Sequence, residues 1–186
     1  MKVFILIGVG IYFLSRAVLF MKQTPQLKTG IYYLFLMLAE IITVVVVIYQ
    51  LFCNTLVCNF LISFHILGFV AFGFGVLISV LARFTLGSEN WQTGRNVSRP
   101  KYLVTDGIYS WIRHPIYLGT WLMGVGFELS LSSWLLFIVV FLGFPFIWYC
   151  SYKEERYLLN WFGNEYQKYK EKTNWFFPIK QIKRLL

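Results

Sequence analysis

Five long apolar segments decide what this chain can fold into. They cover residues 3–20, 31–52, 60–81, 115–131 and 134–152, and each is 17 to 22 residues long. About 20 apolar residues in an α-helix cross the hydrocarbon core of a bilayer. A segment in lipid must also satisfy its own backbone hydrogen bonds, which a helix does. The sequence therefore predicts an all-α integral membrane protein with about five transmembrane helices.

The composition argues against a soluble globular domain. Hydrophobic residues make up 58% of the 186 residues and charged residues only 13%, whereas an ordinary soluble domain has about a quarter charged residues. We expect one membrane domain over residues 1–186, with three N-terminal spans in 1–82 and the site-bearing region in 83–186. The first apolar segment is expected to remain as a helix rather than a cleaved signal peptide, because Arg16 interrupts it and no small-residue cleavage site follows.

The basic residues are distributed as membrane topology requires. The net charge is +9, and 15 of the 17 basic residues follow the first, third and fifth apolar segments. Segments 53–59 and 132–133 carry no charge. The positive-inside rule then places the N-terminus outside and the basic loops and the C-terminus in the cytoplasm. We expect an anionic lipid surface as the partner of these residues, and no nucleic acid.

Two motifs that often mark metal or cofactor sites are weak in this chain. Cys53 and Cys58 share the predicted outer loop and either pair or stay free, whereas Cys150 lies in the fifth apolar segment. No second Cys or His stands at zinc-ligand spacing, so no metal is expected. Two Gly-x-Gly pairs lie inside apolar segments with no strand before them, which favours close helix packing over a Rossmann phosphate loop. They are formed by Gly8, Gly10, Gly73 and Gly75.

Four ionisable residues interrupt the apolar segments. Arg16 and Glu128 stand near the ends of their segments and are expected at the membrane interface. Glu40 and His65 stand deeper, on successive segments. Although an intramembrane ionisable group also invites a functional role, we expect these two to satisfy each other across a helix pair.

Only two polar stretches are long enough to build a site, residues 83–113 and 153–186. Turn-forming residues in the first stretch disfavour a continuous helix. In the second, we expect the fifth helix to extend to a break at Gly163, followed by a short amphipathic helix that ends at Pro178. Only residues 132–133 separate the last two apolar segments. These segments should therefore form a tight helical hairpin that brings both polar stretches to one membrane face.

A basic turn precedes the fourth apolar segment. Arg113 and His114 stand directly before Pro115, and proline is favoured in the first turn of a helix. This arrangement places a guanidinium, an imidazole and exposed backbone N–H groups at a helix N-terminus, which suits an anion or a carboxylate. Tyr109 and Tyr117 flank the turn with flat faces suited to a planar ring. The alternative from composition alone is a basic anchor with an aromatic belt.

The same turn carries a resemblance to a known family. Residues 113–119 read RHPIYLG, and an apolar stretch separates them from Glu154 and Glu155. This resembles the RHPxYxG, hydrophobic, EE signature of the isoprenylcysteine carboxyl methyltransferase family and its phospholipid methyltransferase relatives. The similarity extends upstream through Leu103, Val104, Gly107 and Tyr109, and downstream through Leu158, Phe162, Gly163, Glu165, Tyr166 and Tyr169. It covers residues 86–178, half of the chain.

The resemblance implies an integral membrane methyltransferase that uses S-adenosylmethionine, with residues 83–186 as the cofactor-binding region. By matching position, the cofactor is expected to contact Lys101, Tyr102, Leu103, Val104, Tyr109, His114, Pro115, Ile116, Tyr117 and Glu154. The carboxylate of Glu154 suits the ribose diol or the ammonium of that cofactor. Glu155 points about 100° away around a helix. We therefore expect it to have a different role, either in catalysis or in an ion pair with Lys or Arg.

The resemblance also implies a lipophilic, isoprenylcysteine-like or prenylated acceptor that enters from the bilayer. Its carboxylate would already be a nucleophile, so the protein mainly has to position it. Arg113 is our candidate for holding that carboxylate or for fixing the pocket wall. Family members that act on prenylated proteins can carry an arginine shortly before the acidic pair, whereas residues 149–152 here read YCSY. A thiol, amine or phospholipid headgroup is the alternative acceptor, and a non-enzymatic membrane subunit is the alternative class.

Overall fold

The structure, a computed structural model, describes residues 62–90, 100–131 and 134–180. Of the second apolar segment it describes residues 38, 41, 42, 44, 45, 48 and 49, all of them helical. The first predicted span, Arg16, Glu40 and the question of the Cys53 and Cys58 pair lie outside the described residues.

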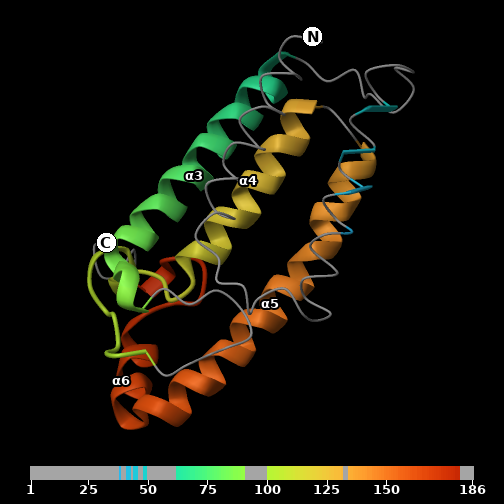
Figure 1. Ribbon diagram of the computed structural model, residues 1–186. Helices are drawn as coiled ribbons and strands as arrows, with labels where there is room; N and C mark the ends of the chain where they lie inside the picture. The colour runs from blue at the N-terminus through green and yellow to red at the C-terminus, as the bar shows by residue number, and fades with distance from the viewer. Residues whose placement is uncertain are drawn as a thin grey trace. The chain divides into compact units, whose positions relative to one another are not determined.

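The described ranges are built from helices (Figure 1). In chain order these are α3 (Ile62–Asn90), the 3₁₀ turn η2 (Gly107–Ser110), α4 (Pro115–Leu131), α5 (Trp134–Phe162) and α6 (Asn164–Lys172). Within these ranges the only strand-like pairing is a single parallel bridge between Ile112 and Asn174. One helix of the described part, Ser63–Gly87 with mean hydropathy 2.3, is long and apolar enough to cross a membrane. The predicted helical fold is confirmed here, and the number of five spans stays a prediction.

The predicted hairpin of the last two apolar segments is confirmed. α4 ends at Leu131 and α5 begins at Trp134. The two helices pack through their side chains, with the ring centroids of Trp121 and Phe144 5.2 Å apart. Pro115 begins α4. At the first position of a helix a backbone N–H has no partner within the helix, so proline loses no hydrogen bond there, and its fixed φ suits the helix. The hairpin therefore brings the segment before α4 back to the distal half of α5.

Contacts divide the chain into two compact units, and one of them contains all the residues predicted for the site. It consists of Phe74–Gln92, Val97–Met123 and Gly143–Leu186. Its core has two apolar clusters, with Ala82, Val104 and Tyr109 in one and Ile112, Leu118 and Phe176 in the other. Ile108 of η2 packs against both clusters. The turn that precedes α4 is therefore anchored by apolar contacts from the loop, the helices and the C-terminal tail.

Small residues bring α3 and α4 close together in this unit. A methyl group on Gly75 would lie 2.7 Å from both the carbonyl oxygen of Gly119 and the backbone nitrogen of Met123. A methyl group on Gly119 would lie 2.7 Å from the carbonyl oxygen of Gly75 and would also meet the Ser79 hydroxyl. The prediction that the third segment's glycines serve helix packing is confirmed for Gly75. For Gly73, no heavy atom of the described residues lies within 4 Å of such a methyl group.

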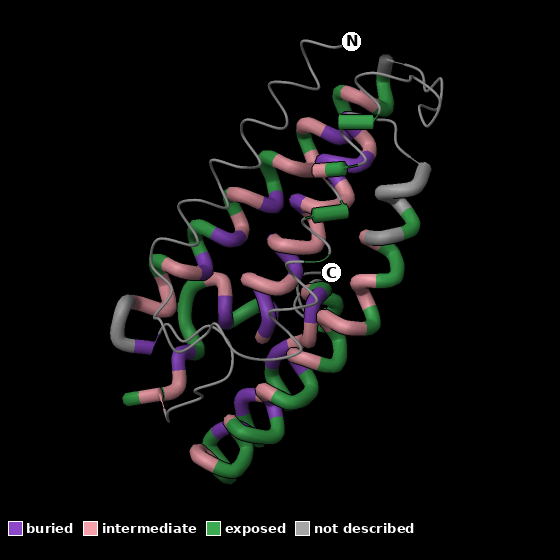
Figure 2. Tube along the Cα trace, turned by 45° about the vertical axis from the view of Figure 1, so that its right-hand side comes forward, coloured by how far each residue is buried: buried purple, intermediate pink, exposed green. Residues whose placement is uncertain are grey.

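Two predicted boundaries are wrong, and one is confirmed. α3 continues well past residue 81, to a kink at Gly87, where φ is 70°, and a short helical piece follows the kink up to Asn90. The break at Gly163 is confirmed, with φ 51°. α6 ends at Lys172 rather than at Pro178, because Thr173 is extended and the chain after it pairs with the turn before α4. α6 is amphipathic as expected, with its tyrosines buried and most of its other residues exposed. Figure 2 shows buried and exposed positions along the described helices.

The isolated polar residues of the other unit have specific surroundings. His65 Nδ1 lies 2.9 Å from the carbonyl oxygen of Ser130, so His65 has a partner other than the predicted Glu40. Glu128 is 4% exposed and lies in a buried run, residues 126–128. This part of α4 therefore faces the interior of its unit, and the expected place of Glu128 near the membrane interface stays a prediction.

Candidate active site

The turn before α4 is bound along its backbone by residues 173–176, which we call the C-terminal strap. The N–H of Arg113 donates to the carbonyl oxygen of Asn174 at 2.8 Å, and the N–H of His114 donates to that of Trp175 at 3.2 Å. The N–H of Asn174 in turn donates to the carbonyl oxygen of Trp111 at 3.4 Å. The prediction that this turn presents exposed N–H groups to an anion is wrong for Arg113 and His114, because carbonyl oxygens of the strap already accept hydrogen bonds from both backbone N–H groups.

Glu155 is the centre of a buried ionic network. Its side chain is 4% exposed, and its Oε1 accepts from Arg113 Nε at 2.6 Å. The same oxygen lies 3.4 Å from His114 Nε2, and Oε2 lies 2.9 Å from Lys170 Nζ. Arg113 Nη1 also donates to the carbonyl oxygen of Thr173 at 2.8 Å. The predicted alternative for Glu155, an ion pair with Lys or Arg, is confirmed, and a catalytic role for it stays a prediction.

The network fixes the ionisation of its carboxylate. Burial alone would raise the pKa of Glu155, but hydrogen bonds from His114, Lys170 and Arg113 outweigh this effect and lower the pKa to about 2. The carboxylate is therefore charged at neutral pH. Because the ordinary pKa of Glu is about 4.3, this contribution to stability is fully present above that pH and is lost as the pH falls towards 2.

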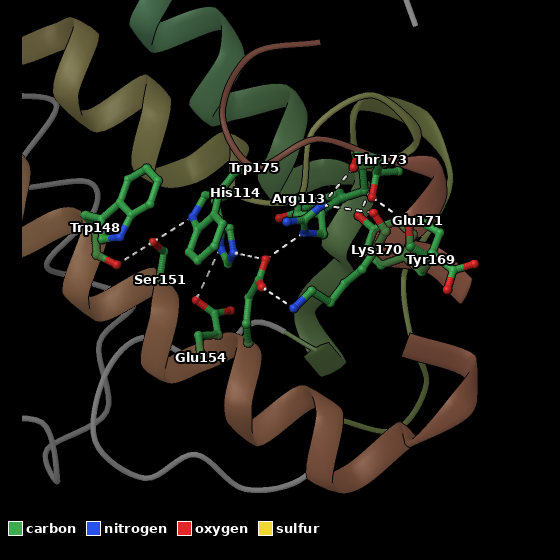
Figure 3. A network of polar contacts seen from close by, with 12 residues as sticks. Arg113, His114, Trp148, Ser151, Glu154, Tyr169, Lys170, Glu171, Thr173 and Trp175 are labelled. Atoms are coloured by element: carbon green, nitrogen blue, oxygen red, sulfur yellow. Dashed lines mark hydrogen bonds and ion pairs between the residues drawn. The ribbon is translucent and has the colours of Figure 1, made fainter. Parts of the chain in front are cut away.

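Glu154 is the accessible part of the site and lies beside the buried His114 (Figure 3). Glu154 points toward the imidazole, with its Oε2 3.8 Å from His114 Nδ1. The Glu154 side chain is 43% exposed, whereas that of His114 is only 3% exposed. Aromatic rings surround the imidazole, with centroids at 5.7 Å for Tyr117, 5.8 Å for Trp175 and 6.0 Å for Phe176. An accessible carboxylate thus stands beside a fixed imidazole and an aromatic wall, which suits a ligand with a cationic or hydroxyl group next to a flat ring.

Trp175 connects the C-terminal strap to α5. Its indole stacks on Trp148, with ring centroids 4.7 Å apart and an interplanar angle of 12°. Its Nε1–H donates to Ser151 Oγ at 2.9 Å, and that hydroxyl donates to the carbonyl oxygen of Trp148 at 2.8 Å. The Arg113 guanidinium lies over the same indole, 5.6 Å from its centroid. Sequence reasoning missed Trp175 and Lys170, because basic and aromatic residues in a tail are also typical of a membrane-surface helix.

The predicted site residues fall into two groups. The structure brings together Arg113, His114, Tyr117, Glu154 and Glu155. In the loop, Val104 and Tyr109 are buried together, Lys101 and Tyr102 are exposed, and Leu103 is half-buried. Pro115 is buried and Ile116 is half-buried. Tyr169 OH donates to the carbonyl oxygen of Tyr109 at 2.7 Å, so the loop is tied to α6.

The arrangement of the acidic pair, the basic turn and the helical hairpin agrees with a known family. The model of that family, described as phospholipid methyltransferase, matches residues 63–165. The chain belongs to the phospholipid methyltransferase family. The resemblance predicted from the RHPIYLG motif and the acidic pair is thereby confirmed. Lys170 and the C-terminal strap lie beyond the matched residues.

Several proteins named protein-S-isoprenylcysteine O-methyltransferase are similar to this chain. The Schizosaccharomyces pombe protein is 36% identical over 80 residues, covering 41% of this chain and 33% of the relative. The Rattus norvegicus protein is 34% identical over 113 residues, covering 59% and 40%. The Saccharomyces cerevisiae protein is 33% identical over 114 residues, covering 56% and 48%. The similarity therefore spans less than half the length of each of these relatives.

A solved structure shares the fold. It is that of the eukaryotic intramembrane Ras methyltransferase called isoprenylcysteine carboxyl methyltransferase, with a TM-score of 0.61 and 25% sequence identity. The similarity covers 86% of this chain and 55% of that one. The fold of this chain is thus similar to that of this solved protein.

Proposed function

We propose that this protein is an integral membrane methyltransferase that uses S-adenosylmethionine to methylate the carboxylate of a lipophilic, isoprenylcysteine-like acceptor. The observation that carries the proposal is the accessible Glu154 carboxylate beside the buried His114 imidazole, at the start of α4 and inside the family-matched region. The names of the similar proteins support the reaction class and the acceptor class.

The side chains around His114 fit S-adenosylmethionine by their chemistry. The Glu154 carboxylate would accept hydrogen bonds from an ammonium or from ribose hydroxyls. The Tyr117 ring beside the imidazole is a flat apolar surface that suits an adenine. When bound, S-adenosylmethionine supplies a methyl group on a positively charged sulfur. The predicted contacts of residues 101–104 and Tyr109 remain part of this proposal.

Positioning is the main task of the protein's own residues in such a transfer. A carboxylate acceptor needs no general base, so the site has to hold the two reactants in line and exclude water. Arg113 is engaged by Glu155 and by the strap carbonyl of Thr173. We therefore assign Arg113 and Glu155 to the wall of the site, the second of the two roles predicted for Arg113. A thiol, amine or phospholipid headgroup remains the alternative acceptor, and a non-enzymatic subunit the alternative class.

The proposal is tested in two stages on detergent-purified protein. Calorimetric titration with S-adenosylhomocysteine should give saturable binding to the folded protein. Single-turnover transfer from labelled S-adenosylmethionine should then methylate a prenylcysteine analogue and leave a small thiol unmodified. Absence of binding to folded protein would favour the non-enzymatic subunit. Methylation of the thiol but not of the prenylcysteine would show that the acceptor is a thiol rather than a carboxylate.

The proposed topology has five spans, an outer N-terminus, and a cytoplasmic site and C-terminus. It rests on the distribution of the basic residues. A sequon at Asn96-Val97-Ser98 lies in the loop assigned to the cytoplasm. On expression in a eukaryotic host, Asn96 should therefore carry no glycan, which a mobility shift after glycosidase treatment would check. A glycan at Asn96 would contradict the proposed orientation and place this loop on the outer side of the membrane.

A further inference from the structure

The ionic network around Glu155 reaches beyond the family-matched residues into α6. Lys170 Nζ lies 2.9 Å from Glu155 Oε2, on the oxygen that neither Arg113 nor His114 contacts. We propose that Lys170 is a positioning residue that holds His114 in the site through Glu155. The inference rests on the proposed function, because it is the methyltransferase site in which His114 would be held.

Both oxygens of the Glu155 carboxylate are needed to set its orientation. The terminal torsion of a glutamate is broad, with no sharp preferred angle. Contacts to Oε1 alone, from Arg113 and His114, would let the carboxylate rotate about that oxygen. The contact of Lys170 with Oε2 removes this freedom. The orientation of the carboxylate, and with it the direction in which the lone pairs of Oε1 face His114 Nε2, then depends on the ammonium of Lys170.

The backbone of Lys170 is itself held against the site. Its carbonyl oxygen accepts from Arg113 Nη1 at 3.4 Å and from Lys180 Nζ at 3.2 Å. The preceding residue, Tyr169, donates its hydroxyl to the carbonyl oxygen of Tyr109. The last turn of α6 is therefore fixed to the turn before α4, so the ammonium is presented to Glu155 from a rigid base.

Loss of the Lys170 charge should affect the site more than the fold. Arg113, the more deeply buried cation, still neutralises Glu155 when Lys170 is replaced, because its side chain is 8% exposed whereas that of Lys170 is 31% exposed. The Lys170→Met variant keeps most of the length of the side chain and removes the charge. Lys170→Arg restores a cation at the same position. Lys168→Met is the matched control, since Lys168 is exposed on the same helix.

The test uses the fact that the chain has two histidines. With ¹⁵N-labelled histidine in ligand-free protein, and a His65→Gln variant for assignment, the ring nitrogens of His114 can be followed by NMR. We expect the Nε2 signal to move in Lys170→Met, to return towards the wild-type position in Lys170→Arg, and to stay unchanged in Lys168→Met. Calorimetry should show S-adenosylhomocysteine binding weakened about threefold to tenfold in Lys170→Met only, the effect of one partly exposed charged contact.

Two results would overturn the inference. One is a His114 signal and an affinity in Lys170→Met that match those of the wild type. The other is a lower unfolding temperature with the His114 signal unmoved, which would make Lys170 a purely structural residue. A wild-type protein that binds no S-adenosylhomocysteine would refute the proposed function instead. The NMR comparison in ligand-free protein would still decide whether Lys170 acts on His114.

Discussion

Replacing Glu155 with Gln should cost more stability than any other single change at this site. The amide keeps the shape of the side chain but removes the charge between Arg113 and Lys170. Arg113, whose side chain is 8% exposed, is then left as a buried cation without its counter-ion. Breaking a buried ion pair from one side costs about 3 to 5 kcal/mol. We therefore expect a clear fall in the unfolding temperature of the detergent-purified variant.

A matched substitution isolates the effect of burial. Glu165→Gln makes the same chemical change at an exposed position in the first turn of α6, where the loss should be at most about 1 kcal/mol. The acid dependence gives a second readout, because the wild type should lose the contribution of Glu155 as the pH falls from about 4 towards 2. The Gln variant should lack this part of the acid transition. Equal unfolding temperatures for the two variants would contradict the role of the network.

The helical hairpin explains why the centre of the site could be predicted from the sequence. Its two helices are long and apolar and are separated by two residues, so the depth of each residue follows from the rise per residue of an α-helix. The short connection predicts that His114, before α4, and Glu154, on the distal half of α5, lie at one face. In the structure His114 Nδ1 and Glu154 Oε2 are 3.8 Å apart. Local geometry and a short connection decided this placement, with little dependence on the rest of the fold.

The outer part of the site depends on tertiary contacts that leave no periodic signal. Residues 173–176 read as the end of an amphipathic helix, yet they pair with the turn before α4 through backbone hydrogen bonds. The spacing of Asn174 and Trp175 in the sequence does not predict that pairing. The same contacts changed the expected role of Arg113. Its guanidinium was predicted to hold an acceptor carboxylate or to fix the wall, and the structure pairs it with a carboxylate from its own chain.

Replacing Glu154 with Gln should instead weaken ligand binding and leave the fold intact. Glu154 is 43% exposed, and its nearest charged or titratable partner in the network is His114 Nδ1 at 3.8 Å, so little folding energy depends on its charge. The neutral amide cannot pair with an ammonium and accepts weaker hydrogen bonds. Losing one charge-assisted hydrogen bond costs about 1.5 to 3 kcal/mol. The dissociation constant of S-adenosylhomocysteine should thus rise on the order of tenfold to a hundredfold.

Calorimetry and thermal unfolding together separate this outcome from that at Glu155. The two carboxylates are neighbours in sequence, but one is accessible and the other is 4% exposed. Glu154→Gln should therefore keep the wild-type unfolding temperature and lose affinity, whereas Glu165→Gln should keep the affinity and lower the unfolding temperature only slightly. An unchanged affinity in Glu154→Gln would remove Glu154 from the binding site, and with it the observation on which the proposed function rests. A lowered unfolding temperature would mean that its charge stabilises the turn before α4 rather than a ligand.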